Sequence, residues 1–153
     1  MGLTLGVRQE AGWGFIGGEV DADISGGAEF VYAPESATCA QEAFAPYMCT
    51  HDATIRLRAV IGADAGNGAS VFGTFGLGIA IGDSAIETNE TAPMSVGGTT
   101  FGLGFQRLMG SGTARIEVIY DDFTNILKEP HPVEDFDPTY EAVTVKVSYL
   151  FPF

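Results

Sequence analysis

The chain ends with Tyr140-Glu-Ala-Val-Thr-Val-Lys-Val-Ser-Tyr-Leu-Phe-Pro-Phe153, a stretch in which apolar side chains alternate with small or polar ones. Apolar residues hold the odd positions from Val143 to Phe151, and Lys146 stands on the opposite face. A period of two is typical of a β-strand whose two faces meet different surroundings. We therefore predict a strand over Tyr140–Phe151.

The same alternation recurs upstream between turn residues, so that seven strands are predicted in one domain, residues 1–153. The predicted strands are Leu3–Gln9, Trp13–Ile24, Ala53–Ala63, Val71–Ile81, Thr99–Leu108, Thr113–Tyr120 and Tyr140–Phe151. Short connections containing Gly are predicted at Glu10–Gly12, Asp64–Ser70 and Met109–Gly112, and long ones at Ser25–Asp52, Gly82–Gly98 and Asp121–Thr139. Alternating short turns and long loops predict an all-β, antiparallel, up-and-down sheet of the kind found in bacterial transmembrane barrels.

Composition narrows the function classes. The 21 glycines disfavour a helical bundle, and the formal net charge of -13 disfavours nucleic-acid partners. Val71–Gly82, the most apolar run, is too short and too glycine-rich for a membrane-spanning helix. No secretory signal peptide is recognised, so for an exported protein this sequence would be the mature form or the true start would lie upstream.

Each predicted strand separates its side chains into an apolar face and a face of small or charged residues. The charged members of the second face are Arg8, Glu19, Asp21, Asp23, Arg56, Arg58, Arg115, Glu117 and Lys146. We predict that they form ion pairs in a closed lumen, because acids and bases lie on neighbouring strands and buried charges need partners. The many glycines of this face favour a narrow interior over a solvated surface. Two alternatives stay open, namely a solvent-facing polar side and a soluble lipocalin-like barrel with its apolar face inward around a small hydrophobic ligand.

The chain resembles the opacity-protein and outer-membrane-protein-A-like small barrels, often called porin-family proteins. The resemblance lies in the order and spacing of Gly14-Phe-Ile-Gly-Gly-Glu-Val-Asp-Ala-Asp23, the Cys39…Cys49 loop, Thr54-Ile-Arg-Leu-Arg-Ala-Val-Ile-Gly62, Phe75-Gly-Leu-Gly-Ile-Ala80 and Val147-Ser-Tyr-Leu-Phe-Pro-Phe153. It implies an eight-stranded barrel in the outer membrane of a Gram-negative bacterium, with lipid and lipopolysaccharide as surroundings. It also implies delivery by the barrel-assembly machinery, which would read Tyr149, Phe151 and Phe153 as the assembly signal.

This chain departs from the family pattern in having seven readable strands, with the first family strand missing. An odd number leaves an open edge on each flank, and unpaired backbone in lipid is costly. Three solutions are open: a true start upstream, direct pairing of Met1–Gln9 with the last strand, or a strand supplied by a partner. We favour the first.

The sequence predicts neither catalytic nor metal-binding nor cofactor-binding residues. His51 and His131 lie in predicted loops, and neither neighbours a serine, as an outer-membrane lipid A-modifying enzyme would need. Cys39 and Cys49 are spaced for a disulfide in an oxidising compartment, with two free thiols as the alternative. Loop carboxylates could share divalent cations with lipopolysaccharide, and these are Glu129, Glu134, Asp135 and Asp137. The leading prediction is a non-enzymatic structural barrel with a largely plugged lumen and long surface loops that serve adhesion or envelope integrity.

Overall fold

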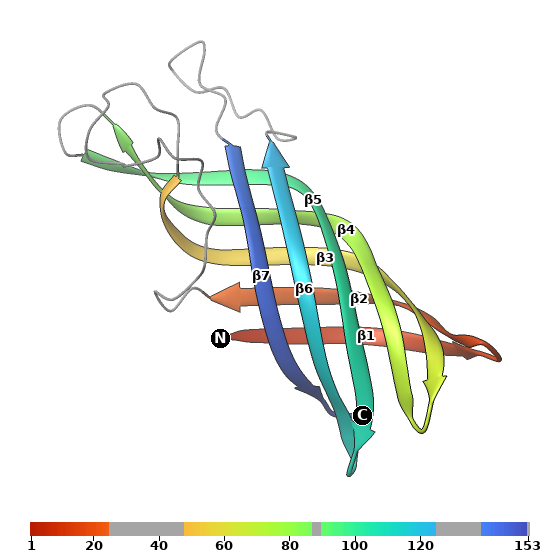
Figure 1. Cartoon of the computed structure of the whole chain (residues 1–153). Coiled ribbons are helices and arrows are strands. Elements are labelled where there is room, and N and C mark those ends of the chain that lie inside the picture. Colours follow the sequence, from red (N-terminus) through yellow and green to blue (C-terminus); the bar gives the residue numbers. More distant parts are fainter. Residues whose placement is uncertain (25–47, 87–89, 125–138, 153) are drawn as a thin grey trace.

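A computed structural model describes residues 1–24, 48–86, 90–124 and 139–152. The chain forms one antiparallel sheet of seven strands in sequence order, shown in Figure 1. The strands are β1 (Gly2–Ala11), β2 (Gly14–Ile24), β3 (Met48–Gly66), β4 (Ala69–Ile86), β5 (Glu90–Met109), β6 (Gly112–Thr124) and β7 (Thr139–Leu150). The prediction of an all-β, up-and-down antiparallel sheet is confirmed, and each of the seven predicted strands is present.

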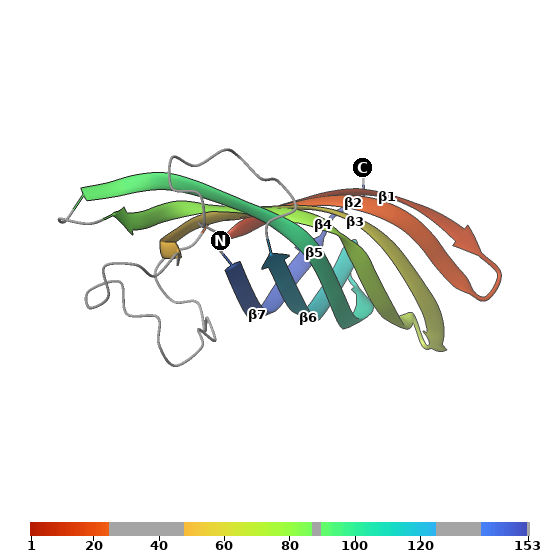
Figure 2. The ribbon, with the colours of Figure 1, turned by 90° about the horizontal axis from the view of Figure 1, so that it is seen from above.

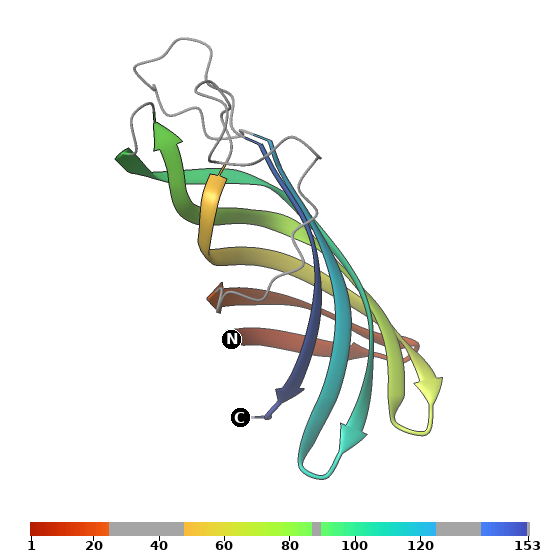
Figure 3. The same ribbon diagram turned by 60° about the vertical axis from the view of Figure 1, so that its left-hand side comes forward.

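The sheet curls strongly but does not close. Figures 2 and 3 show it bending so that β6 and β7 pass over the face of β1, β2 and β3. Every strand pairs with its neighbours in sequence, and within the described residues β1 and β7 are the two ends of the order. The closed barrel predicted from the sequence is therefore not present in the described part of the chain. The number of strands is odd and all six pairings are antiparallel, so β1 and β7 run in the same direction.

The tight turn between β3 and β4 has the backbone conformation that a two-residue connection requires. Asn67 and Gly68 join β3 to β4 with φ angles of 53° and 70°. Positive φ at both central residues is the type I′ geometry that matches the twist of a hairpin, and Asn-Gly is its preferred sequence.

The predicted strand start at Trp13 is wrong by one residue, because Trp13 lies in the turn before Gly14 and β2 begins after it.

The predicted long connection Gly82–Gly98 is wrong. β4 continues to Ile86 and β5 starts at Glu90, with pairs from Gly82↔Met94 to Ile86↔Glu90. The backbone ladder needs no apolar side chains, so the two strands stay paired after the apolar alternation has ended. β3, β4 and β5 have 19, 18 and 20 residues, whereas a tilted strand crosses a bilayer in about 9–11. The hairpin of β4 and β5 thus extends well past its apolar part.

The two faces of the sheet are opposite in chemistry. Large apolar side chains on the convex face are exposed from β1 to β7, as Leu5, Leu57, Leu77, Leu103 and Val145 illustrate at 55–74% exposure. The concave face is the interior, and there twelve of the described polar or charged side chains are buried against eight apolar ones. Side-chain alternation along each strand produces this division.

Candidate functional site

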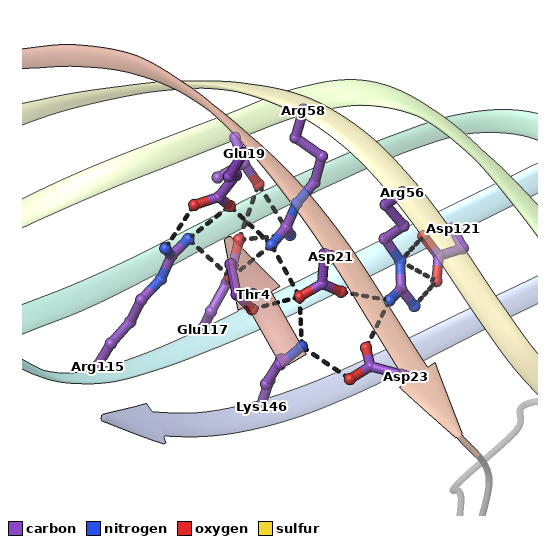
Figure 4. A network of polar contacts seen from close by, with 11 residues as sticks. Thr4, Glu19, Asp21, Asp23, Arg56, Arg58, Arg115, Glu117, Asp121 and Lys146 are labelled. Atoms are coloured by element: carbon purple, nitrogen blue, oxygen red, sulfur yellow. Dashed lines mark hydrogen bonds and ion pairs between the residues drawn. The ribbon is translucent and has the colours of Figure 1, made fainter. Parts of the chain in front are cut away.

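The interior holds one connected network of charges, drawn in Figure 4. Five carboxylates meet four cations in the described part of the chain, through ten ion pairs. The carboxylates are Glu19, Asp21, Asp23, Glu117 and Asp121, and the cations are Arg56, Arg58, Arg115 and Lys146. Their strands are β2, β3, β6 and β7, so the network crosses the interior from one side of the curled sheet to the other.

Arg56 links β3 to β2 and β6. Its Nη1 lies 3.0 Å from Asp21 Oδ1 and 2.7 Å from Asp23 Oδ2. Its Nε and Nη2 donate to Asp121, with Nη2 2.5 Å from Oδ2. A planar guanidinium with five donors can bridge carboxylates on two sides at once, which a lysine ammonium does less specifically.

Arg58 and Arg115 share two glutamates. Arg58 Nη2 lies 2.8 Å from Glu19 Oε1, and its Nη1 lies 2.9 Å from Glu117 Oε1. Arg115 contacts the second oxygens of the same carboxylates, at 2.8 Å from Glu19 and 3.0 Å from Glu117. All four side chains are at most 6% exposed. Such close pairing is what makes the burial of four charges tolerable.

Lys146 joins the last strand to the second. Its Nζ donates to Asp21 and lies 2.7 Å from Asp23 Oδ1. Glu117 stands opposite Lys146 in the β6–β7 register, but its carboxylate bonds Arg58 and Arg115 instead. The reach of Lys146 across the interior to β2 follows from the curl of the sheet, which period-two alternation does not reveal.

Among the described residues, no carboxylate lies within 4.0 Å of the Arg8 guanidinium, so the ion pair predicted for Arg8 stays a prediction. Instead its Nη2 donates to Gln106 Oε1 at 3.2 Å, and the guanidinium lies 4.0 Å above the ring of Phe15. A cation over an aromatic face is attracted by the ring quadrupole. The side chain itself is exposed.

Apolar clusters lie on both sides of the charges along the interior. Phe15, Val60 and Phe72 pack together near the short turns. Ala80, Val96, Phe123 and Ala142 form a second cluster toward the other end. Arg115 connects the first cluster to the network, because its guanidinium stacks at 4.0 Å over Phe72. The interior is thus apolar near the short turns, charged in the middle and apolar again toward the other end.

Sequence reasoning missed two interior residues that obey the same alternation, Thr4 and Asp121, which bond Asp21 and Arg56. It did place Thr74 and Gln106 on the inner face, where they bond Glu117 and Arg8. Asp121 lies four positions after Glu117 and therefore on the same face, so the period alone could have identified it. The buried aromatic residues Phe15, Phe72 and Phe123 depart from the small-or-charged pattern of the inner face, so the sequence pattern did not indicate that they lie in the interior.

The remaining residues for which the sequence made predictions divide into those that the structure describes and those that lie outside the described ranges. Tyr149 and Phe151 are exposed on the outer face, with ring centroids 4.9 Å apart. His51 Nε2 lies 2.6 Å from Thr54 Oγ1, at the start of the long strand β3. The other predictions concern residues outside the described ranges, and these residues are Cys39, Glu129, His131, Glu134, Asp135, Asp137 and Phe153. The Cys39–Cys49 disulfide and the loop cation site therefore stay predictions.

The described residues contain no group of three or more His, Cys, Asp or Glu side chains arranged to hold a metal ion. The clustered carboxylates are interleaved with guanidinium groups, which occupy the positions that a cation would need. In the part of the chain that the structure describes, no helix has the length and hydropathy to cross a membrane.

No protein-family model matches this sequence, and no curated protein or solved structure matches it either. The resemblance to small outer-membrane barrels therefore rests on the residues quoted for it, and the physical properties of the sheet carry the functional argument.

Proposed function

We propose that this chain is the membrane-embedded part of a small β-barrel with a structural, non-enzymatic role, sited in the outer membrane of a Gram-negative bacterium. Outer-membrane lipid and lipopolysaccharide would surround it, and the barrel-assembly machinery would insert it, as for the opacity-protein and outer-membrane-protein-A-like proteins that the sequence resembles. Its interior is a plug of ion pairs, and its long connections face the cell exterior, where adhesion or envelope integrity would be served.

The inverted distribution of side chains is the observation that carries this proposal. Twenty-nine large apolar side chains are exposed among the described residues, while arginines and carboxylates are buried. Monomeric soluble proteins rarely expose contiguous apolar patches larger than a few hundred Å². A hydrocarbon environment makes the same surface favourable, and pairing with both neighbours satisfies the backbone groups of the five strands β2 to β6, as lipid requires.

The apolar alternation has the length that a bilayer requires. On β4 the exposed apolar residues run from Val71 to Ile81, eleven positions, and a tilted strand crosses a bilayer in about 9–11 residues. A soluble carrier of a hydrophobic ligand needs the opposite arrangement, with apolar side chains lining the interior. The buried Arg56, Arg58 and Arg115 argue against that alternative.

A lipid A-modifying enzyme remains the second class of function. Such activity would need a histidine beside a serine near the membrane edge. The described histidine, His51, bonds a threonine hydroxyl. No specific observation favours this class, so the structural role is preferred.

Two readouts on refolded protein test the proposal. We expect folding and solubility to depend on detergent or lipid, with a shift in gel migration between unheated and boiled samples. In planar bilayers we expect no stable openings on the nanosiemens scale, because the ion network and both apolar clusters fill the interior. A soluble, detergent-free monomer would overturn the membrane assignment, whereas stable nanosiemens openings would overturn the plug.

A further inference from the structure

Arg107 of β5 is the one lysine or arginine side chain on the outer face of the sheet among the described residues. It is exposed and alternates with the buried Gln106, so it points outward with Phe105. No carboxylate of the described residues forms an ion pair with it. The other described arginine and lysine side chains belong to the inner face, namely Arg8, Arg56, Arg58, Arg115 and Lys146. The charge of Arg107 is therefore available to a group outside the chain.

Arg107 stands at the border of the apolar outer face. The neighbouring row of outward residues across β4 to β7 is apolar and exposed, and it consists of Val71, Phe105, Ile116 and Val147. On the other side of Arg107, β5 ends two residues later at Met109. The turn that follows lies at the same end of the sheet as the β3–β4 turn (Figure 1). Acyl chains that cover the apolar row would bring their headgroups level with Arg107, the depth at which basic side chains anchor membrane proteins.

Two alanines flank Arg107 on the neighbouring strands. Ala69 of β4 and Ala114 of β6 are its partners in the two ladders. Adjacent strands lie about 4.7–4.9 Å apart, so the guanidinium has only a methyl group on each side. Tyr149 of β7 borders Ala114, and its hydroxyl donates to the carbonyl oxygen of Met109. The arrangement leaves space for a ligand beside the guanidinium, above the two alanines.

The opposite border of the outer face carries acids instead. Asp122 of β6 and Glu141 of β7 stand directly opposite each other in the ladder, next to Thr99 of β5. The chain as a whole has a formal net charge of -13, which repels anions. An anionic headgroup is thus attracted to the outer face at the border of Arg107 and repelled at the border of Asp122 and Glu141.

A lipid phosphodiester matches the chemistry around Arg107. The guanidinium fork can bind two phosphate oxygens at once, and its methylene stem can lie along the apolar surface beside it. A membrane lipid adds acyl chains that contact the neighbouring apolar row, which a free phosphate ion lacks. Arg107 and the apolar row therefore favour a ligand that combines the two parts.

We propose that Arg107, Ala69 and Ala114 form a binding site, the Arg107 seat, for the phosphodiester headgroup of a membrane lipid. The lipid belongs to the leaflet on the side of the short turns, and its acyl chains lie on the row that contains Phe105 and Ile116. This inference rests on the proposed function, because acyl chains reach that row only if the apolar face lies in the membrane.

A short-chain phospholipid tests the Arg107 seat on the full chain folded in neutral maltoside micelles, which contain no phosphate. The probe is dihexanoylphosphatidylglycerol, and binding is followed by NMR through the Arg107 side-chain N–H and the Ala69 amide. We expect both signals to shift and to saturate at a single lipid per chain. Dihexanoylglycerol has the same acyl chains without phosphate, and inorganic phosphate has no acyl chains. Each of these should leave both signals unchanged.

Substitutions on the outer face separate the Arg107 seat from general attraction between charges, with the Ala69 amide as the signal. Arg107→Gln should weaken binding about fivefold, the usual effect of one basic residue near anionic lipid. Arg107→Lys should restore part of the affinity, because the ammonium keeps the charge but lacks the fork. Ala114→Leu keeps the charge, fills the space beside the guanidinium and should weaken binding as Arg107→Gln does. Met109→Gln, at the next outward position of β5, is the matched control and should bind as the unmodified chain does.

The position of these residues makes a loss of binding separable from a loss of fold. All of them point outward, and neutral micelles offer no phosphate to lose, so each variant should keep the gel migration shift of the unmodified chain.

Equal affinity of Arg107→Gln and the unmodified chain would overturn the Arg107 seat, and so would equal binding of dihexanoylglycerol. Binding of inorganic phosphate as tight as that of the phospholipid would contradict the lipid partner. None of these results would contradict membrane embedding, which fails only if the folded chain is soluble without detergent.

Discussion

At the scale of single residues, Arg58 is a charged side chain that is buried among the carboxylates of other strands. It is 2% exposed and holds Glu19 and Glu117 from two different strands. Removing one partner of a buried ion pair leaves an uncompensated charge, which typically costs about 3–5 kcal/mol. We expect Arg58→Met to lower the free energy of unfolding in micelles by about that amount, measured by urea titration.

Arg107→Met is the matched control for this prediction. Arg107 lies on β5, is exposed and takes no part in the network. Its replacement should change the free energy of unfolding by less than about 0.5 kcal/mol, as is usual for exposed sites. Equal effects of the two substitutions would mean that the interior is solvated and that its charges are not held by their partners.

The network was partly predictable from residue positions. Alternation placed Glu19, Asp21, Asp23, Arg56, Arg58, Arg115, Glu117 and Lys146 on one face, and ion pairs join all eight of them. Alternation could not assign partners across the interior, because those depend on how the sheet curls. Arg8 shows the limit, since its neighbours are Gln106 and Phe15.

At the scale of the strands, close approach of β3 and β4 depends on Gly76. A Cβ built there would lie 2.0 Å from the carbonyl oxygen of Leu57 and 2.7 Å from the Cα of Arg58. Those atoms belong to backbone, so the strands themselves would have to move. We expect Gly76→Ala to lower the free energy of unfolding by about 1–3 kcal/mol, the usual range for overpacking.

Gly73 on the same strand is the control for this second prediction. Its nearest neighbour for an added Cβ is Gly102 O at 3.7 Å, an ordinary contact. Gly73→Ala should be neutral or stabilising by up to about 1 kcal/mol, because alanine restricts the unfolded chain more than glycine does. Similar losses in both variants would show that strand spacing does not limit stability here.

The number and order of strands were predictable because each strand carries its own alternation and each turn its own glycine. Strand ends were less predictable where backbone pairing between two strands continues beyond the alternation of apolar and polar side chains. β4 and β5 remain paired from Gly82↔Met94 to Ile86↔Glu90, in a stretch whose sequence is typical of a loop. Trp13 shows the reverse case, an apolar residue in a turn.

At the scale of the whole molecule, two properties matter for function. The charged side chains are buried while the large apolar ones are exposed, and the outer edges of β1 and β7 are unpaired within the described residues. The sequence indicated both the polar interior and the odd number of strands. It could not indicate that β1 and β7 would line a common groove, because that depends on the curvature accumulated over seven strands. The central claim is that the exposed apolar face lies in lipid.

Quenching of a single tryptophan tests this claim most directly. Leu57 is outward, 64% exposed and central in β3. We would combine Leu57→Trp with Trp13→Phe, and make Ser111→Trp in the same background as a control in the β5–β6 turn. In vesicles containing lipids brominated along the acyl chains, we expect strong bromine quenching at position 57, little quenching by aqueous iodide there, and the reverse at position 111. Quenching at position 57 by iodide and not by brominated lipid would contradict the account.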